Sequence, residues 1–188
     1  YRTYYERVPK FRQEKADALK LAQGRAQSIG VWALYEEMKK EYGIQKDAAY
    51  NLSHSGEYVL CSVHEGKDPK IRVGCDIEEI GICNMKIARR FFCRSEYEKI
   101  DSETNEERRR ELFFRYWVLK ESFIKATREG MAMGLDTFEI ALGENGNPSV
   151  LLERPSATGS LFIIWNRQQK IKSTGSRSAR RTRRSIRR

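Results

Sequence analysis

The sequence predicts an α+β fold, and three observations support that prediction. Stretches with helical spacing come first, short strand-like runs follow, and helices and then strands come again. The strands do not alternate with helices as they do in βαβ proteins. No internal repeat is visible, and hydrophobic residues make up 39% of the 188, enough for a real core.

The first part of the chain has two predicted helices, 5–20 and 25–42, and Gly43 stands where a helix C-terminus favours glycine. We expect residues 44–50 to be a linker. Strands are then predicted at 58–63 and 71–78. Because residues 65–69 between these strands form a turn signal, we expect the two to pair as a hairpin.

The second part is predicted to begin with a helix at 84–92 with Asn84 as its N-cap, and a short helix opening at Ser95. A long helix follows at 106–128, which we expect Gly130 and Gly134 to end. The remaining predicted elements are a hairpin of 137–142 with 149–152 and a last strand at 161–165.

The net charge of +10 comes from the C-terminal segment. Residues 167–188 contain ten Lys and Arg and no acidic residue, and without them the chain has 26 basic and 26 acidic residues. We expect this segment to be disordered, since it has no hydrophobic periodicity. A nucleic-acid-binding function is therefore expected only through this tail, and not through the neutral body.

Location is predicted from the absence of hydrophobic segments. No apolar run approaches the ~18 residues of a membrane span, and the first residues are polar rather than typical of a signal peptide. We therefore expect a cytoplasmic protein without a membrane partner. Its four cysteines are expected to be reduced thiols.

Acidic residues end the second predicted strand. Side chains alternate along a strand, so Asp76 and Glu78 are expected to share one face while Cys75 and Ile77 point the other way. Two adjacent carboxylates repel each other, and Mg²⁺, which prefers hard oxygen ligands, would relieve that repulsion. The alternative is a solvated strand face.

The long helix has a second polar group. Trp117, Glu121 and Lys125 are spaced i, i+4, i+8 and lie along one stripe. Glu121 can be a third carboxylate or a general base, and Lys125 can contact a phosphate. The alternative is an ordinary surface Glu–Lys pair.

Small polar residues around a histidine form the third group, at 51–56. We expect a tight loop in which Ser53, His54 and backbone N–H groups donate hydrogen bonds to phosphate oxygens. The alternative is a turn with a satisfied histidine. Acids for a metal, a base and phosphate donors together suit group transfer at a pyrophosphate. P-loop, Rossmann and G-x-S-x-G motifs are missing from the sequence.

These three motifs occur in the order and form found in the 4′-phosphopantetheinyl transferases, and the chain resembles the larger, Sfp-type members of that family over about residues 5–165. The resemblance implies an α+β transferase fold of two similar halves related by a pseudo-twofold. We place the halves at 1–72, for binding the coenzyme A phosphates, and 73–166, for metal and catalysis, followed by the tail at 167–188.

The resemblance also implies the chemistry. Phosphopantetheine would pass from coenzyme A to a serine of an acyl or peptidyl carrier protein, and 3′,5′-adenosine bisphosphate would leave. Asp76, Glu78 and Glu121 would hold Mg²⁺. Glu121 would accept the serine proton, although which carboxylate does so stays open.

Further implied residues bind the two substrates. Lys125, Ser53 and His54 would hold phosphate oxygens, while Arg12, Lys15 and Ser28 match positions near the 3′-phosphate. The carrier would dock on the segment after Glu78, where apolar and basic side chains gather: Ile82, Met85, Lys86, Arg89, Arg90, Phe91 and Phe92. The family implies a monomer. A catalytically impaired binding protein is the remaining alternative.

Overall fold

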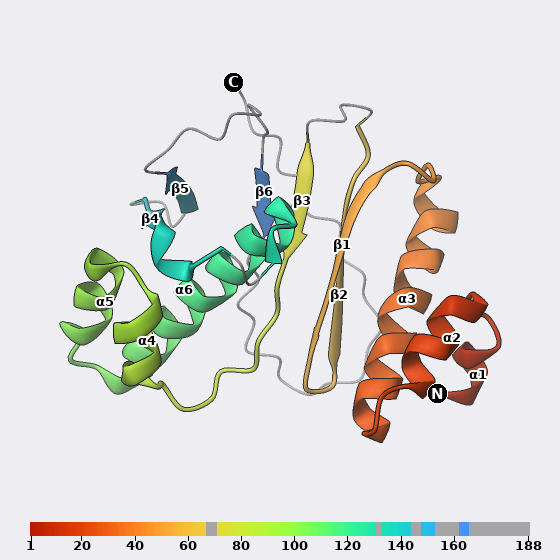
Figure 1. Cartoon of the computed structure of the whole chain (residues 1–188), viewed down its shortest axis with the longest axis horizontal. Coiled ribbons are helices and arrows are strands. Elements are labelled where there is room, and N and C mark those ends of the chain that lie inside the picture. Colours follow the sequence, from red (N-terminus) through yellow and green to blue (C-terminus); the bar gives the residue numbers. More distant parts are fainter. Residues whose placement is uncertain (67–70, 131–132, 144–147, 153–161, 166–188) are drawn as a thin grey trace.

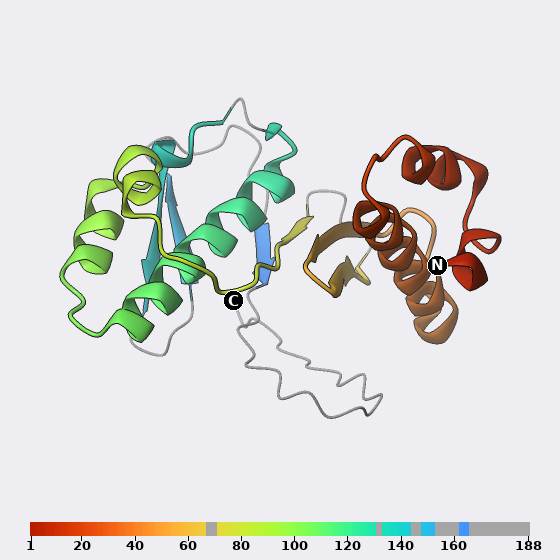
Figure 2. The ribbon, with the colours of Figure 1, turned by 90° about the horizontal axis from the view of Figure 1, so that it is seen from below.

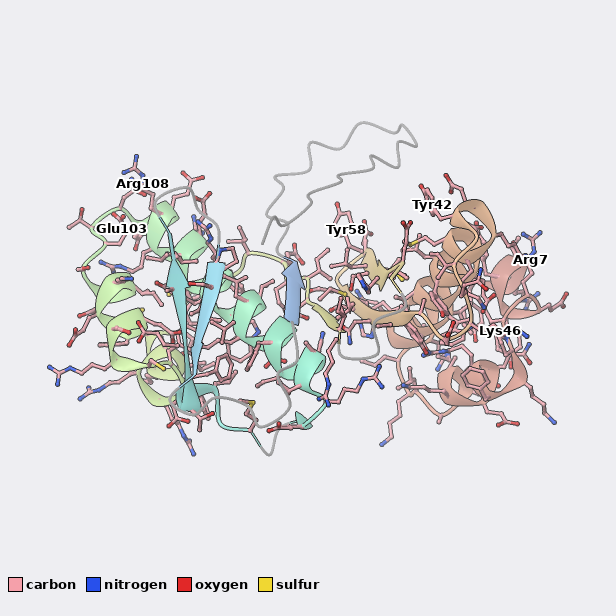
Figure 3. All side chains as sticks on the ribbon, turned by 90° about the horizontal axis from the view of Figure 1, so that it is seen from above. Arg7, Tyr42, Lys46, Tyr58, Glu103 and Arg108 are labelled. Atoms are coloured by element: carbon pink, nitrogen blue, oxygen red, sulfur yellow. The ribbon has the colours of Figure 1, made fainter. Side chains whose placement is uncertain are left out.

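The structure is a computed structural model that describes residues 1–66, 71–130, 133–143, 148–152 and 162–165. Helices lie at two ends of the protein, with strands between them. In Figures 1 and 2, helices α1–α3 lie on one side and α4–α6 on the other, and strands β1–β3 run between the two groups. The charged side chains labelled in Figure 3 lie at the two outer ends, Glu103 and Arg108 at one and Arg7 and Lys46 at the other.

The first helical group comprises α1 (Arg2–Tyr5), α2 (Lys10–Asp17) and α3 (Ala22–Tyr42). The single helix predicted at 5–20 is wrong, because Pro9 adopts an extended conformation and becomes the N-cap of α2. The predicted end of the next helix is confirmed: Gly43 has a left-handed φ of 63°, and its N–H donates to the carbonyl oxygen of Lys39.

An antiparallel hairpin of β1 (Ala49–Ser55) and β2 (Tyr58–His64) follows. This hairpin differs from three predictions. The end of the predicted linker at 44–50 and most of the predicted loop at 51–56 belong to β1, and the strand predicted at 58–63 pairs with β1 instead of with 71–78. A two-residue turn joins β1 to β2, and its first residue, Gly56, has a left-handed φ of 54°. The predicted turn at 65–69 lies partly outside the described residues.

The strand predicted at 71–78 is shorter than expected. β3 spans Arg72–Cys75 and pairs in parallel with β6, Phe162–Trp165. It packs so tightly on helix α6 that a Cβ built on Gly74 would lie 1.8 Å from the carbonyl oxygen of Ser122. This contact brings the acidic residues after β3 next to the stripe of Trp117, Glu121 and Lys125 on α6.

The second helical group is close to its prediction. Its elements are α4 (Met85–Phe91), α5 (Arg94–Asp101), α6 (Glu106–Thr127), the 3₁₀ helix η2 (Leu135–Thr137), and the antiparallel pair β4 (Phe138–Leu142) and β5 (Pro148–Leu152). Asn84 caps α4 as predicted, since its side chain accepts from the N–H groups of Lys86 and Ile87. The end of α6 differs: Arg128 takes the left-handed position expected of a glycine.

Two hydrophobic clusters stabilise the two groups. One lies between α4, α5, α6 and β4 around Tyr116, Phe123 and Phe138; the other lies between α2, α3 and the hairpin around Ile29 and Trp32. None of the helices in the described part of the chain combines the length and apolar character of a transmembrane span. The predicted α+β class is confirmed.

The proposed pseudo-twofold, and the boundaries at residues 72 and 166, stay predictions. The expected disorder at 167–188 falls on residues outside the described structure.

Candidate active site

Strand β1 and the segment just after β3 meet at the centre of the site, through side chains at alternate positions of each. The Ser53 hydroxyl donates to Asp76 Oδ1 over 2.8 Å, and two residues further along each segment the Ser55 hydroxyl donates to Glu78 Oε2 over 3.0 Å. The two serines of β1 and the two acids after β3 therefore have the same two-residue spacing, and each serine contacts one acid. Sequence reasoning missed Ser55, and the shared two-residue spacing was the signal that would have found it.

Asp76 is a buried acid with two hydrogen-bond donors on one oxygen. Its side chain is 5% exposed, and Oδ1 also accepts a hydrogen bond from Lys125 Nζ at 2.6 Å. Lys125 donates to the Ser53 hydroxyl as well, at 3.0 Å. The other oxygen, Oδ2, is buried and has no hydrogen-bond partner in the structure. Asp76 therefore has one satisfied and one unsatisfied acceptor.

Glu78 and Glu121 complete the acidic group. Burial raises the pKa of Glu121, the charge of Asp76 raises it further, and Lys125 lowers it. Burial likewise raises the pKa of Glu78, whereas hydrogen bonds from Ser55 and from the Trp117 side chain lower it. Burial and the charge of Asp76 therefore outweigh the opposing effect of Lys125 on both glutamates.

The acidic group is not arranged as a preformed metal site, but its charge suits a divalent cation. Within the described residues, no three His, Cys, Asp or Glu side chains are arranged as a metal-binding group, and Lys125 holds one oxygen of Asp76. The buried Oδ2 of Asp76 has no hydrogen-bond partner among the described residues, and after burial the charge of Asp76 helps to raise the pKa of Glu78 and Glu121, so the site has negative charge that Lys125 does not fully offset. A hard cation with oxygen ligands would meet it.

His54 lies on β1 between the two serines, so it faces the other side of the strand. Its side chain is exposed. Partial desolvation lowers the pKa of His54, and the nearby charges of Lys125 and Lys15 lower it further, so the imidazole is neutral at pH 7 and donates from one nitrogen. Lys15 of α2 thus lies within electrostatic range of His54.

Arg12 and Ser28 are held in the helical group next to His54. The Arg12 guanidinium stacks over Trp32 at 4.4 Å, and burial lowers its pKa. The Arg12 Nε and the Ser28 hydroxyl are both buried without a hydrogen-bond partner in the structure. Both donors are thus unsatisfied within the described part of the chain.

The structure therefore brings most of the predicted site residues together. Ser53, Asp76 and Lys125 are directly hydrogen-bonded, while Glu78 and Glu121 interact with Asp76 through charge. Lys125 pairs with Asp76, and not with Glu121 as in the alternative of an ordinary surface pair. Arg12 and Ser28 lie apart from this group, among the α2 and α3 residues. Each assigned role remains a prediction.

Comparison with known proteins identifies the family. The profile of the 4′-phosphopantetheinyl transferase superfamily matches residues 72–175, more than half of the chain. This chain belongs to the 4′-phosphopantetheinyl transferase superfamily. The match covers all four predicted catalytic and metal-binding residues: Asp76, Glu78, Glu121 and Lys125.

Similar members of the superfamily include two Bacillus proteins. The chain is 35% identical over 117 residues to 4′-phosphopantetheinyl transferase Sfp of Bacillus subtilis, which covers 62% of the chain and 49% of that protein. It is 41% identical over 103 residues to 4′-phosphopantetheinyl transferase psf-1 of Bacillus pumilus, which covers 55% and 42%. The chain thus spans about half the length of these relatives.

A solved structure is also similar, the holo-[acyl-carrier-protein] synthase of Thermotoga maritima. The TM-score is 0.38 and the identity 28%, over 44% of this chain and 48% of the synthase.

Proposed function

We propose that this protein transfers the 4′-phosphopantetheine group of coenzyme A to a serine of an acyl or peptidyl carrier protein. The observation that carries the proposal is the group of Asp76, Glu78 and Glu121, in which a buried carboxylate oxygen lacks a partner and Lys125 lies within 2.6 Å of the other oxygen. Superfamily membership supports the same reaction.

Asp76, Glu78 and Glu121 would hold Mg²⁺ in this proposal. The ion, when bound, neutralises charge on the pyrophosphate of coenzyme A and orients it for in-line displacement. Lys125 would then share its donors between Asp76 and a phosphate oxygen, because its side chain is 31% exposed and can reach outward. Ser53 and His54 offer further donors on the two faces of β1.

The reaction forms one bond and breaks one. The carrier serine oxygen attacks the phosphorus that bears pantetheine, the bridging P–O bond breaks, and 3′,5′-adenosine bisphosphate leaves with the bond electrons. Glu121 would accept the serine proton, directly or through water. Lys125 and His54 would stabilise the charge that develops on the phosphate oxygens.

The 3′-phosphate of coenzyme A would bind to the N-terminal helical group. Arg12 and Lys15 lie one helical turn apart on α2, and the buried hydroxyl of Ser28 on α3 has no hydrogen-bond partner among the described residues. The negative charge of a phosphate would satisfy these donors.

The carrier protein would dock on the segment after Glu78 and on α4. Ile82 and Phe91 are exposed there, whereas Phe92 is in the core. The side chains of Lys86, Arg89 and Arg90 are exposed on the same helix and would meet an acidic partner. A cytoplasmic location and a monomeric state are part of this proposal.

Intact-mass spectrometry tests the reaction. A purified apo carrier protein, incubated with this protein, coenzyme A and Mg²⁺, is expected to gain the mass of one phosphopantetheine. Asp76→Ala and EDTA should each abolish the gain, whereas Asp101→Ala, which removes an exposed acid of α5, should preserve it. An unchanged carrier mass across fatty-acid, polyketide and peptide-synthetase carriers, from a folded protein, would contradict the proposal.

A further inference from the structure

Lys120 is a charged residue with no role in the chemistry proposed above. It directly precedes Glu121 on α6, yet its side chain is 0% exposed, within the core of the second helical group. Lysine is rarely buried completely, because removing an ammonium from water costs several kcal/mol unless it is well paired. Its position therefore needs an explanation from its contacts.

The Lys120 ammonium has partners for all three of its protons. Nζ lies 2.9 Å from Glu96 Oε2 and donates to the carbonyl oxygens of Leu135 and Phe138, each at 2.6 Å. It also lies 4.4 Å from the centre of the Phe138 ring. These contacts hold α6 to the segment that leads into β4.

Glu96 extends the same network to two further backbone groups. Its carboxylate accepts from the N–H of Cys93 at 2.9 Å, at the start of α5, and from the N–H of Ile140 at 2.7 Å, in β4. The Lys120–Glu96 pair therefore joins α5, α6 and β4 at one buried point. A fully satisfied buried network of this kind restricts the geometry of its surroundings.

Stability alone does not explain the pair. Apolar side chains of similar volume often stabilise a core as well as a buried ion pair does, because the pair must first be desolvated. What the pair adds is directional contact: it fixes both the rotation and the axial position of α6. Adjacent residues of a helix project about 100° apart, so the rotation that buries Lys120 also sets the direction of Glu121.

We propose that Lys120, held by Glu96, is a positioning residue that keeps Glu121 and Lys125 facing Asp76. The inference rests on the transfer reaction proposed above. It deepens that proposal by assigning a function to a residue that touches neither substrate nor the acidic group. Lys125 provides the link, since it lies on α6 and contacts Asp76 from there.

Two variants separate positioning from stability. Lys120→Met removes the ammonium but leaves Glu96 buried without its counter-charge, and should be destabilised. Lys120→Met with Glu96→Gln removes both charges and keeps an acceptor for the Ile140 N–H, so its stability should return toward wild type. Lys39→Met is the control, because it breaks the partly buried Lys39–Glu36 pair of α3, also a lysine with a glutamate and outside the α6 core.

Turnover is measured on carrier protein at a temperature where circular dichroism shows each variant folded. We expect kcat to fall at least about tenfold in both Lys120 variants, as misplacement of catalytic groups does, with KM for coenzyme A within about threefold. Mn²⁺ binding, followed by electron paramagnetic resonance, should weaken in both variants, and Lys39→Met should change neither quantity.

The double variant decides the question. If its kcat returns to the wild-type value together with its stability, Lys120 is only a stabilising residue and the inference is wrong. If wild type itself transfers nothing to any carrier, the proposed function fails, while weaker Mn²⁺ binding in a folded double variant still supports positioning.

Discussion

Asp76 keeps one carboxylate oxygen buried, with no hydrogen-bond partner in the part of the chain that the structure describes. A buried polar group in that condition costs free energy in the folded state, so proteins retain one mainly where a ligand or ion completes it. The two neighbouring glutamates add to the cost, since burial and like charge raise the pKa of both Glu78 and Glu121. The same residues therefore lower stability unless a cation, as proposed, offsets their charge.

The raised pKa of Glu121 gives a prediction for stability against pH. A carboxyl whose pKa is higher in the folded than in the unfolded state contributes stability below its unfolded pKa, and that contribution is lost as pH rises through the folded value. In EDTA, the wild-type protein should thus lose stability relative to Glu121→Gln as pH rises from the ordinary glutamate pKa upward.

Urea denaturation at a series of pH values, with EDTA present, measures this difference. At pH values below the ordinary glutamate pKa, the gap between wild type and Glu121→Gln should be independent of pH. Glu111→Gln, a half-buried acid on the same helix, serves as a control for amide substitution. A stability gap that is the same at all pH values would show that Glu121 has no raised pKa.

At the same scale, sequence reasoning found the acids and the lysine but not their pairing. The i, i+4 spacing of Glu121 and Lys125 left a contact within the helix as the alternative to phosphate binding, yet Lys125 reaches Asp76 on a different segment. Spacing within α6 contains no information about what packs against it. The Lys120–Glu96 pair was missed for the same reason, since nothing in the local sequence shows that this lysine is buried.

At the scale of the elements, the site depends on the close approach of β3 to α6 at Gly74. A Cβ at that position would lie 1.8 Å from the Ser122 carbonyl oxygen and 2.8 Å from the Ala126 backbone nitrogen, and neither backbone atom can move without shifting the helix. Gly74→Ala should therefore destabilise the protein by more than about 3 kcal/mol, at the upper end of overpacking effects.

Gly30→Ala is the matched control for this prediction. A Cβ on Gly30, inside α3, would make an ordinary 3.8 Å contact with Val59, so the change should be neutral or stabilise by up to about 1 kcal/mol through helix propensity. Urea denaturation compares the two variants. Equal stabilities would mean that β3 does not approach α6 as closely as the structure has it.

The hairpin shows why element prediction succeeded in part. Strand 58–63 was recognised from its composition, but its partner was sought at 71–78 because the polar segment 51–56 resembles a loop. Tertiary packing decides otherwise: Leu52 and Tyr50 of β1 contact the α2–α3 core, and that burial stabilises a strand with polar residues at alternate positions. The helices, with longer hydrophobic periodicity, were predicted more reliably, except where Pro9 interrupts one.

For the molecule as a whole, the site is built from two separately packed cores. The hairpin, packed on α2 and α3, supplies Ser53 and His54; the core around α6 supplies Glu121 and Lys125. A single ligand that touches both would explain why the two cores face each other across β1 and β3. Coenzyme A, with a pyrophosphate and a distant 3′-phosphate, has the charge distribution to do so.

Lys15 tests whether the N-terminal core binds the distant phosphate. Lys15→Met should weaken coenzyme A binding about tenfold, the value of one charge-assisted hydrogen bond, and leave binding of 3′-dephospho-coenzyme A within about twofold. Isothermal titration calorimetry measures both. Lys10→Met, at the start of the same helix, should change neither affinity.

Because the charge of Lys15 lowers the pKa of His54, Lys15→Met should also raise that pKa in an NMR titration. Equal loss of affinity for both ligands would place Lys15 at the pyrophosphate instead, and no loss for either would remove α2 from the coenzyme A site.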